Sequence, residues 1–270
     1  MRSLRSLRGD PVTAPVTPTV SGIAYRPGGP LADIYVPEGA RASVVLVHGG
    51  AFVIGSRRMK PMRYLVAQLT AARLAVLAID YRMIFRGGRL AEATDDVVDA
   101  FAFWAEQAPT FGLDPARISM VGLSAGATLS LLAGARCDGL AALVSCFGLY
   151  EVDHLHGPAT VFPRLLFATG DRAAWTARSP RHAPQAAAPT LLLHGTDDGL
   201  VPAVQAERLA AHRVSQGLPT RLVIYEGAPH GFFNLAHHPA AEAAVREIVE
   251  HAYSTATSAS ASGPSRSSTK

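Results

Sequence analysis

The chain has 270 residues, of which 49% are hydrophobic and 17% are charged, and this balance indicates one large globular domain rather than a disordered or fibrous protein. No apolar run approaches the roughly 20 residues that a membrane-spanning helix needs. The formal net charge is only +4, and no basic stripe is interleaved with aromatic residues, so we expect no binding to nucleic acid.

The two ends of the chain differ in composition from the part between them. Residues 1–20 are rich in Pro, Thr and Arg, and residues 254–270 are rich in Ser, Thr and Ala. Neither stretch carries enough apolar surface to offset the entropy lost on ordering. We therefore expect two disordered tails and a single domain over residues 21–253.

Two features bear on the cellular compartment. The N-terminal arginines are followed by no apolar stretch, which argues against a secretory signal. Cys137 and Cys146 stand in or next to apolar segments, and we expect two buried thiols rather than a disulfide. Both features predict a cytoplasmic protein. The sequence does not indicate an oligomeric state.

Short apolar runs alternate with segments of helical periodicity along the domain. We expect strands at residues 34–36, 43–47, 75–79, 118–122, 141–146, 190–193 and 221–225, and helices at 59–72, 91–107, 125–135, 203–216 and 240–253. Near-continuous Val, Ile, Leu and Ala runs are typical of strands buried on both faces of a parallel sheet. The order predicts an α/β fold, with a doubly wound, mostly parallel sheet of about eight strands flanked by helices.

Chemistry is expected in the loops after the strands, because ligands of such sheets bind at the carboxyl ends of the strands. The strand at 43–47 runs into His48-Gly49-Gly50-Ala51-Phe52. Small residues here allow backbone N–H groups to point into a cleft, where they can stabilise an oxyanion. We expect His48 itself to be structural and to fix this loop by hydrogen bonds.

The strand at 118–122 leads into Gly122-Leu123-Ser124-Ala125-Gly126, and a helical segment follows at once. This G-x-S-x-G pattern between a strand and a helix is typical of a nucleophilic serine on a sharp turn, where flanking glycines allow close packing. An ordinary glycine-rich turn is the alternative for this segment alone. The N–H of Ala125, directly after the serine, is a further candidate oxyanion donor.

Two later loops supply an acid and a base. The strand at 190–193 ends in His194-Gly195-Thr196-Asp197-Asp198, and either aspartate could orient an imidazole while the other caps a helix. The strand at 221–225 leads into the segment Gly227-Ala228-Pro229-His230-Gly231. The chain order Ser, Asp, His, each after its own strand, distinguishes His230 from the other histidines.

The HGGAF, GLSAG, HGTDDGLVP and PHGF segments resemble the α/β-hydrolase superfamily, and within it the hormone-sensitive-lipase-like carboxylesterases. The resemblance covers about residues 22–253 and implies Ser124 as nucleophile and His230 as general base. In such relatives the acid stands three residues before the Val of a Val-Pro pair, which selects Asp198 and leaves Asp197 in reserve.

The resemblance also implies an oxyanion hole formed by Gly50, Ala51 and Ala125, with Gly49 as a further possible donor. The chain departs from the family where Ala51 replaces the usual glycine. It also departs after Asp80-Tyr81-Arg82, where the usual Ala-Pro-Glu continuation is absent. Full-cap relatives carry a long N-terminal extension, so we expect only a small lid insertion, at residues 151–188.

These residues predict a serine carboxylesterase that hydrolyses small-molecule esters through an acyl-enzyme, with no metal and no cofactor. One alternative is an arylformamidase-like amide hydrolase, which would use the same chemistry on an arylformamide. Another is a non-catalytic hydrolase fold used for binding. The aromatic residues of the insertion, Phe162, Phe167 and Trp175, could line a substrate pocket or simply pack the lid.

Overall fold

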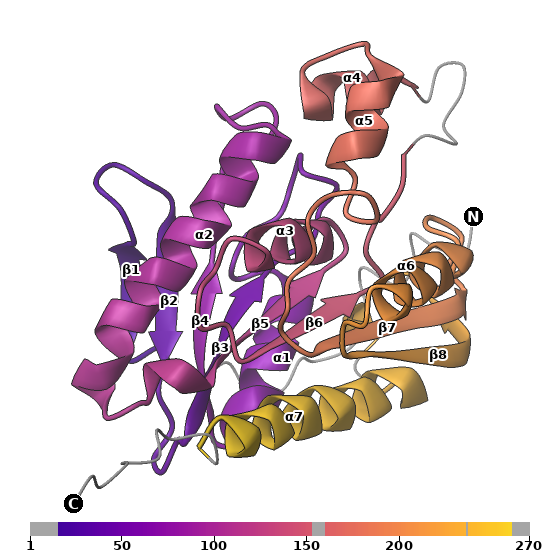
Figure 1. Ribbon diagram of the computed structural model, residues 1–270. Coiled ribbons are helices and arrows are strands. Elements are labelled where there is room, and N and C mark those ends of the chain that lie inside the picture. Colours follow the sequence, from indigo (N-terminus) through magenta and orange to yellow (C-terminus); the bar gives the residue numbers. More distant parts are fainter. Residues whose placement is uncertain (1–15, 153–159, 236, 261–270) are drawn as a thin grey trace, which may run out of the picture.

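A computed structural model describes residues 16–152, 160–235 and 237–260. Its centre is an eight-stranded sheet in the order β1-β2-β4-β3-β5-β6-β7-β8 (Figure 1). The strands are β1 (Val20–Ala24), β2 (Leu31–Tyr35), β3 (Ala42–Val47), β4 (Leu74–Ile79), β5 (Ile118–Leu123), β6 (Ala142–Cys146), β7 (Thr190–Asp197) and β8 (Thr220–Pro229). Strand β2 pairs antiparallel with β1 and β4, and the pairs from β4 through β8 are parallel.

Helices cover both faces of the sheet. They are α1 (Lys60–Ala71), α2 (Leu90–Gln107), α3 (Ala125–Gly134), α4 (Val161–Phe167), α5 (Arg172–Arg178), α6 (Val204–Ser215) and α7 (Pro239–Ser260). Helices α2, α3 and α6 bury their apolar residues in one core layer, and α1 and α7 bury theirs in the other (Figure 1).

Strand β3 shows how the sequence builds two cores. Val45 and Val47 pack in the layer of α2 and α3, whereas Val44 and Leu46 pack in the layer of α1 and α7. Successive side chains of a strand point to opposite faces, so an unbroken apolar run supplies both layers at once. The predicted fold, a doubly wound and mostly parallel sheet of about eight strands, is confirmed.

Two elements differ from the sequence-based expectation. Strand β1 begins at Val20, within the expected tail, and it is a partly exposed edge strand with an irregular register. Helix α7 continues to Ser260, so residues 254–260 are helical rather than part of a disordered tail. They contain neither Gly nor Pro, and nothing in them stops a helix that is already formed. The rest of the two expected tails, residues 1–15 and 261–270, lies outside the described residues.

The expected insertion at residues 151–188 contains the short helices α4 and α5, and its residues 153–159 lie outside the described part of the chain. The two ends of the insertion are tied together, because the Arg181 N–H donates to the Tyr150 carbonyl at 3.2 Å and its guanidinium lies 3.0 Å from Glu151. Trp175 and Phe167 are both buried in the core, and Phe167 also borders a cavity.

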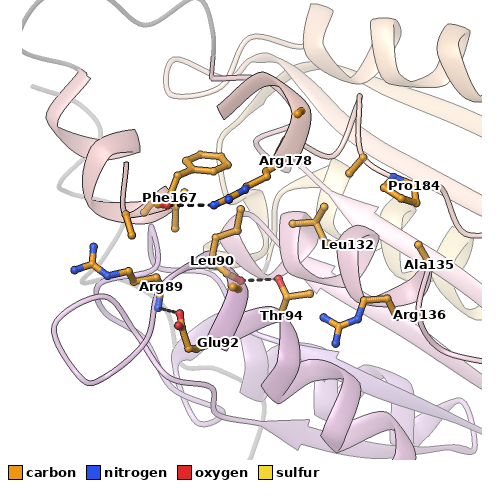
Figure 2. A pocket seen from close by; sticks show the side chains of 15 residues that line it. Arg89, Leu90, Glu92, Thr94, Leu132, Ala135, Arg136, Phe167, Arg178 and Pro184 are labelled. Atoms are coloured by element: carbon orange, nitrogen blue, oxygen red, sulfur yellow. Dashed lines mark hydrogen bonds between the residues drawn. The ribbon is translucent and has the colours of Figure 1, made fainter. Parts of the chain in front are cut away.

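A cavity of about 500 Å³ separates the lid helices from α2 and α3 (Figure 2). Leu90, Leu132 and Phe167 line its apolar wall, and the side chains of Arg136 and Arg178 also line it. None of its lining residues belongs to the segments in which the sequence places nucleophile, acid and base. The chemistry is therefore to be sought at the carboxyl edge of the sheet.

Candidate active site

Ser124 stands between the end of β5 and the first residue of α3, in a strained backbone conformation with φ 51° and ψ −116°. The glycines around it are required sterically. A Cβ on Gly122 would lie 2.3 Å from the Gly126 carbonyl oxygen, and one on Gly126 would lie 2.3 Å from the Val47 oxygen. Strand and helix therefore meet too closely for any side chain at these two positions, and the turn presents Ser124 at the sheet edge.

His230 follows directly after β8 and approaches the serine from across the sheet edge. Its Nε2 lies 3.0 Å from Ser124 Oγ, within hydrogen-bonding distance. The edge of the Phe147 ring packs against the imidazole, with ring centroids 5.2 Å apart at 68°. Phe147 has a positive φ of 42°, so the chain holds a bulky residue in an unfavourable conformation at this contact.

Asp198 occupies the turn after β7, and its carboxylate is fully buried. Its Oδ2 lies 2.7 Å from His230 Nδ1, and its Oδ1 accepts hydrogen bonds from the N–H groups of Leu200 at 2.9 Å and Val201 at 2.8 Å. Burial alone would raise the pKa of Asp198, but hydrogen bonds from His194 and His230 and from the backbone hold it well below its usual range. The group is therefore a carboxylate at neutral pH.

Asp197 is exposed, and the structure places it away from the imidazole. Its carboxylate lies 3.4 Å from the Thr196 hydroxyl. We refer to Ser124, His230 and Asp198 as the triad, because they form one continuous series of contacts. The structure thus brings together the three side chains that the sequence selected, and Asp197 is not among them.

The loop after β3 lies against the serine. A Cβ on Gly49 would come within 3.1 Å of the Ser124 Cβ. Gly50 has φ 121° and Ala51 has φ 51°, and a Cβ on Gly50 would lie 1.8 Å from the Ile54 carbonyl oxygen. Within the described part of the chain, the N–H groups of Gly50 and Ala51 donate to no acceptor. Ala125 opens α3, where the N–H groups have no partner within the helix. These three amides can serve a ligand.

His48 is completely buried beneath this loop, as expected of a structural residue. Its Nδ1 lies 2.6 Å from the Gly49 oxygen, and its ring stacks on Tyr81 at 4.3 Å. The Tyr81 hydroxyl in turn donates to the His48 carbonyl at 3.1 Å. Burial lowers the pKa of His48, so its ring is neutral and its contacts stabilise the loop.

Two residues that contact the triad were missed by the sequence analysis. His194 lies in the recognisable HGTDD segment, four residues before Asp198, and that spacing was its only signal. Phe147 had no signal, because its contact with His230 depends on the ends of β6 and β8 meeting in space. No group of His, Cys, Asp and Glu among the described residues could hold a metal ion. No helix within the described ranges is long and apolar enough to cross a membrane.

The fold and the triad geometry define the class of protein as an α/β-hydrolase. A family model described as BD-FAE matches residues 32–150. The inhibited esterase B from Lactobacillus rhamnosis has a similar structure, with a TM-score of 0.81 at 15% identity, over 96% of this chain and 94% of that one.

Curated relatives have esterase names. The probable isoprenylcysteine alpha-carbonyl methylesterase ICME of Oryza sativa subsp. japonica is 28% identical over 227 residues, which are 73% of this chain and 54% of that protein. The ethyl acetate hydrolase of Pseudomonas putida is 35% identical over 97 residues, which are 36% of this chain and 30% of that protein. The chain spans about half the length of the first of these relatives. The family model, these relatives and the solved structures support a likeness to the hormone-sensitive-lipase-like carboxylesterases, on an α/β-hydrolase fold.

Proposed function

We propose that this protein is a serine carboxylesterase that hydrolyses small-molecule esters through an acyl-enzyme intermediate. The observation that carries the proposal is the continuous series from Ser124 Oγ to His230 Nε2 at 3.0 Å and from His230 Nδ1 to Asp198 Oδ2 at 2.7 Å. A hydroxyl in this arrangement can lose its proton as it attacks a carbonyl carbon, because the base and its orienting acid are already aligned.

The reaction follows from these contacts in two half-reactions. As Ser124 Oγ attacks the ester carbonyl, His230 Nε2 takes its proton, and the Asp198 carboxylate stabilises the resulting imidazolium. The tetrahedral intermediate collapses when His230 returns the proton to the leaving alcohol, and the acyl-enzyme is left. Water then attacks the acyl carbon, His230 takes a proton from it, and the carboxylic acid leaves as that proton returns to Ser124.

We assign the oxyanion hole to the N–H groups of Gly50, Ala51 and Ala125. Their support is the contact between the loop after β3 and Ser124, together with the N–H groups that no protein acceptor uses in that loop. Two or more donors aimed at the tetrahedral oxygen stabilise the charge that develops in the transition state. The methyl group of Ala51 narrows the space beside these donors.

Ester rather than amide substrates are supported by the names of the relatives, which are a methylesterase and an ethyl acetate hydrolase. Phe162 of the insertion packs against Phe52 in the loop after β3, with ring centroids 6.2 Å apart, so the insertion approaches the loop that lies beside Ser124. We therefore propose short acyl chains.

The test is hydrolysis of p-nitrophenyl acetate by the parent protein and by Ser124→Ala. We expect the variant to lose at least about a thousandfold in kcat, because Ser124 carries the hydroxyl that faces His230 Nε2 and the described residues place no other nucleophile in contact with it. Ser215→Ala, which alters an exposed serine of α6, is the matched control and is expected to keep parent activity. Parent-level hydrolysis by Ser124→Ala would contradict the proposal.

The cytoplasm is the compartment we propose for the protein. Its two cysteines are both free, and burial raises the pKa of the Cys137 thiol to about 12. Thiols that need no oxidising environment agree with a reducing compartment.

A further inference from the structure

A second histidine, His194, lies in the buried end of β7 and contacts the acid of the triad. Its Nε2 lies 3.1 Å from Asp198 Oδ2 and 2.9 Å from the carbonyl oxygen of Val201. Asp198 Oδ2 is the oxygen that also faces His230 Nδ1. The side chains of His194 and Asp198 are both fully shielded from solvent, so no water competes for these contacts.

The surroundings of the His194 ring fix its proton. Both neighbours of Nε2 are oxygen acceptors, so Nε2 carries the hydrogen and shares it between them. Nδ1 is buried and has no hydrogen-bond partner among the described residues. A proton on Nδ1 would be a buried donor without an acceptor, which is costly. His194 is therefore the neutral tautomer with hydrogen on Nε2.

The same contacts hold the turn that carries the acid. Asp198 Oδ1 accepts from the N–H groups of Leu200 and Val201, and His194 binds the Val201 carbonyl from the other side. One carboxylate oxygen is thus held by the backbone of its own turn, and His194 of β7 contacts both the other oxygen and that backbone. A carboxylate held at both oxygens cannot rotate away from the imidazole that it orients.

We infer that His194 is a positioning residue for the triad, whose neutral imidazole donates its Nε2 hydrogen to Asp198 and to the turn that presents it. This inference rests on the proposed function of the triad. His194 does not touch the substrate or Ser124, and it acts only through the carboxylate.

The groups that face this cluster are few. Around Asp198 lie His194 from β7, His230 from the loop after β8, and Tyr150 from the loop after β6, whose hydroxyl pairs with Ser145. Around His230 lie Asp198, Ser124 and the apolar edge of Phe147. Among the described residues, no lysine or arginine side chain takes part in these contacts. The charge of Asp198 and the groups that donate to it are therefore the main electrostatic influence on His230.

Loss of the His194 donor should shift the pH dependence of the reaction in a predictable direction. The N–H of His194 withdraws negative charge from the oxygen that His230 also faces. Without it the carboxylate attracts the protonated imidazole more strongly, because an opposite charge favours the charged form. The acid limb of the kcat/KM profile, which reports the free enzyme's base, then moves to higher pH.

Three substitutions of His194 distinguish a role as hydrogen-bond donor from a role in packing alone. His194→Gln keeps an N–H group near the position of Nε2, His194→Asn places its amide near the position of Nδ1, and His194→Phe fills the space without any donor. Thermal unfolding of each full-length variant verifies that it is folded. The pH profile of kcat/KM for p-nitrophenyl acetate, and kcat and KM at the plateau, are then compared with the parent.

We expect His194→Phe and His194→Asn to lose about tenfold or more in kcat with little change in KM, since such supporting partners are worth about 10–100-fold where they have been removed elsewhere. Their acid limb is expected to rise by about 0.5 pH unit or more. His194→Gln is expected to restore kcat to within about threefold of the parent and to return the acid limb to its parent position.

Two results would overturn the inference. One is a folded His194→Phe or His194→Asn protein with an unmoved acid limb and parent kcat. The other is a His194→Gln protein as impaired as His194→Asn, since the position of the donor would then not matter. If His194→Phe fails to fold, the Gln and Asn pair still decides.

A second measurement distinguishes a failure of the proposed carboxylesterase function from a failure of the positioning role of His194. The rate at which a fluorophosphonate labels Ser124 gives the same acid limb without any ester substrate. Parent protein that is labelled but hydrolyses no ester would contradict the carboxylesterase proposal, whereas the pH dependence of labelling in the His194 variants would still test the positioning role.

Discussion

At the scale of single residues, the site depends on backbone conformations that few side chains tolerate. Ser124, Ala51 and Phe147 all have positive φ without being glycine, and each lies in or next to the triad or the loop after β3, which we call the oxyanion loop after its proposed role. Such conformations cost of order 1–3 kcal/mol each and persist only where surrounding contacts enforce them. At Ser124 the enforcing contacts are the close approach of β3, β5 and α3 around Gly122 and Gly126.

Replacement of Gly126 by alanine tests this close approach. The added methyl group would meet the carbonyl oxygens of Val47 and His48 at 2.3 and 2.5 Å, so β3 and the oxyanion loop must shift. We expect a loss of stability of about 1–3 kcal/mol and a marked loss of kcat. Denaturant unfolding and p-nitrophenyl acetate kinetics measure both effects. Gly199→Ala, where a methyl group meets nothing within 4 Å, is the control and should behave like the parent.

The two adjacent aspartates give a second prediction at this scale. Asp198→Asn removes the charge that stabilises the His230 imidazolium and favours the wrong imidazole tautomer, so we expect kcat to fall by roughly 10³–10⁴. Asp197→Asn alters an exposed side chain and should leave kcat within about twofold of the parent. Steady-state kinetics of the two variants decide between them, and the reverse order of effects would show that Asp197 is the acid.

At the scale of elements, the lid is anchored at its base. Glu151 is buried, and its carboxylate lies 3.0 Å from Arg181 and 3.7 Å from Arg208. The buried amide oxygen of Gln205 accepts from the N–H groups of Tyr150 and Glu151, which ties the start of the lid to α6. Further out, the Arg89 guanidinium donates to the Leu165 carbonyl at 2.6 Å and links α4 to the start of α2.

Removal of one partner from the buried pair tests this anchor. Arg181→Met leaves the Glu151 carboxylate with only the more distant Arg208, and we expect a loss of about 1–2 kcal/mol, because Arg181 is itself partly exposed. Arg208→Met, which removes an arginine that is 54% exposed, should cost much less. Chemical denaturation of both variants gives the comparison. Equal stabilities would show that the base of the lid does not depend on Arg181.

At the scale of the whole molecule, acid stability follows from two buried carboxylates. Burial alone would raise the pKa of Asp33, but hydrogen bonds from Arg58, the Gly22 N–H and Arg57 lower it below its usual value. The pKa of Asp198 is lowered in the same way by the histidines and backbone around it. Since the folded pKa is below the unfolded one, each group stabilises the fold above its unfolded pKa and loses that contribution as the pH falls through the folded one.

Asp33→Asn isolates one of these contributions. The parent protein is expected to lose stability as the pH falls below about 4, because its folded state resists protonation of these carboxylates. The Asn variant should be less stable at pH 7 but lose less between pH 7 and pH 3. Thermal unfolding at several pH values measures both slopes. Parallel curves for the two proteins would show that Asp33 does not contribute to the acid transition.

The sequence by itself determined the central strands, the major helices and the candidate residues of the site. Strand β5 is buried throughout and the motif around Ser124 follows it directly, whereas the motif around His230 follows β8, which is mostly half-buried. Strand β1 and the helices α4 and α5 gave no usable pattern, because a partly exposed strand of five residues and helices of seven are too short for a period to emerge.

Only the tertiary structure decided which aspartate faces the imidazole and which further residues hold it. Asp197 and Asp198 are adjacent and chemically identical, yet the folded chain exposes Asp197 and buries Asp198. The contact of Phe147 with His230 joins the ends of β6 and β8, which are distant in sequence. The contact of His194 with Asp198 forms because the turn after β7 brings the carboxylate back beside the strand. Local sequence patterns encode whether a segment forms a strand or a helix and which of its faces is buried. The distances between side chains of different segments depend on how the strands align in the sheet.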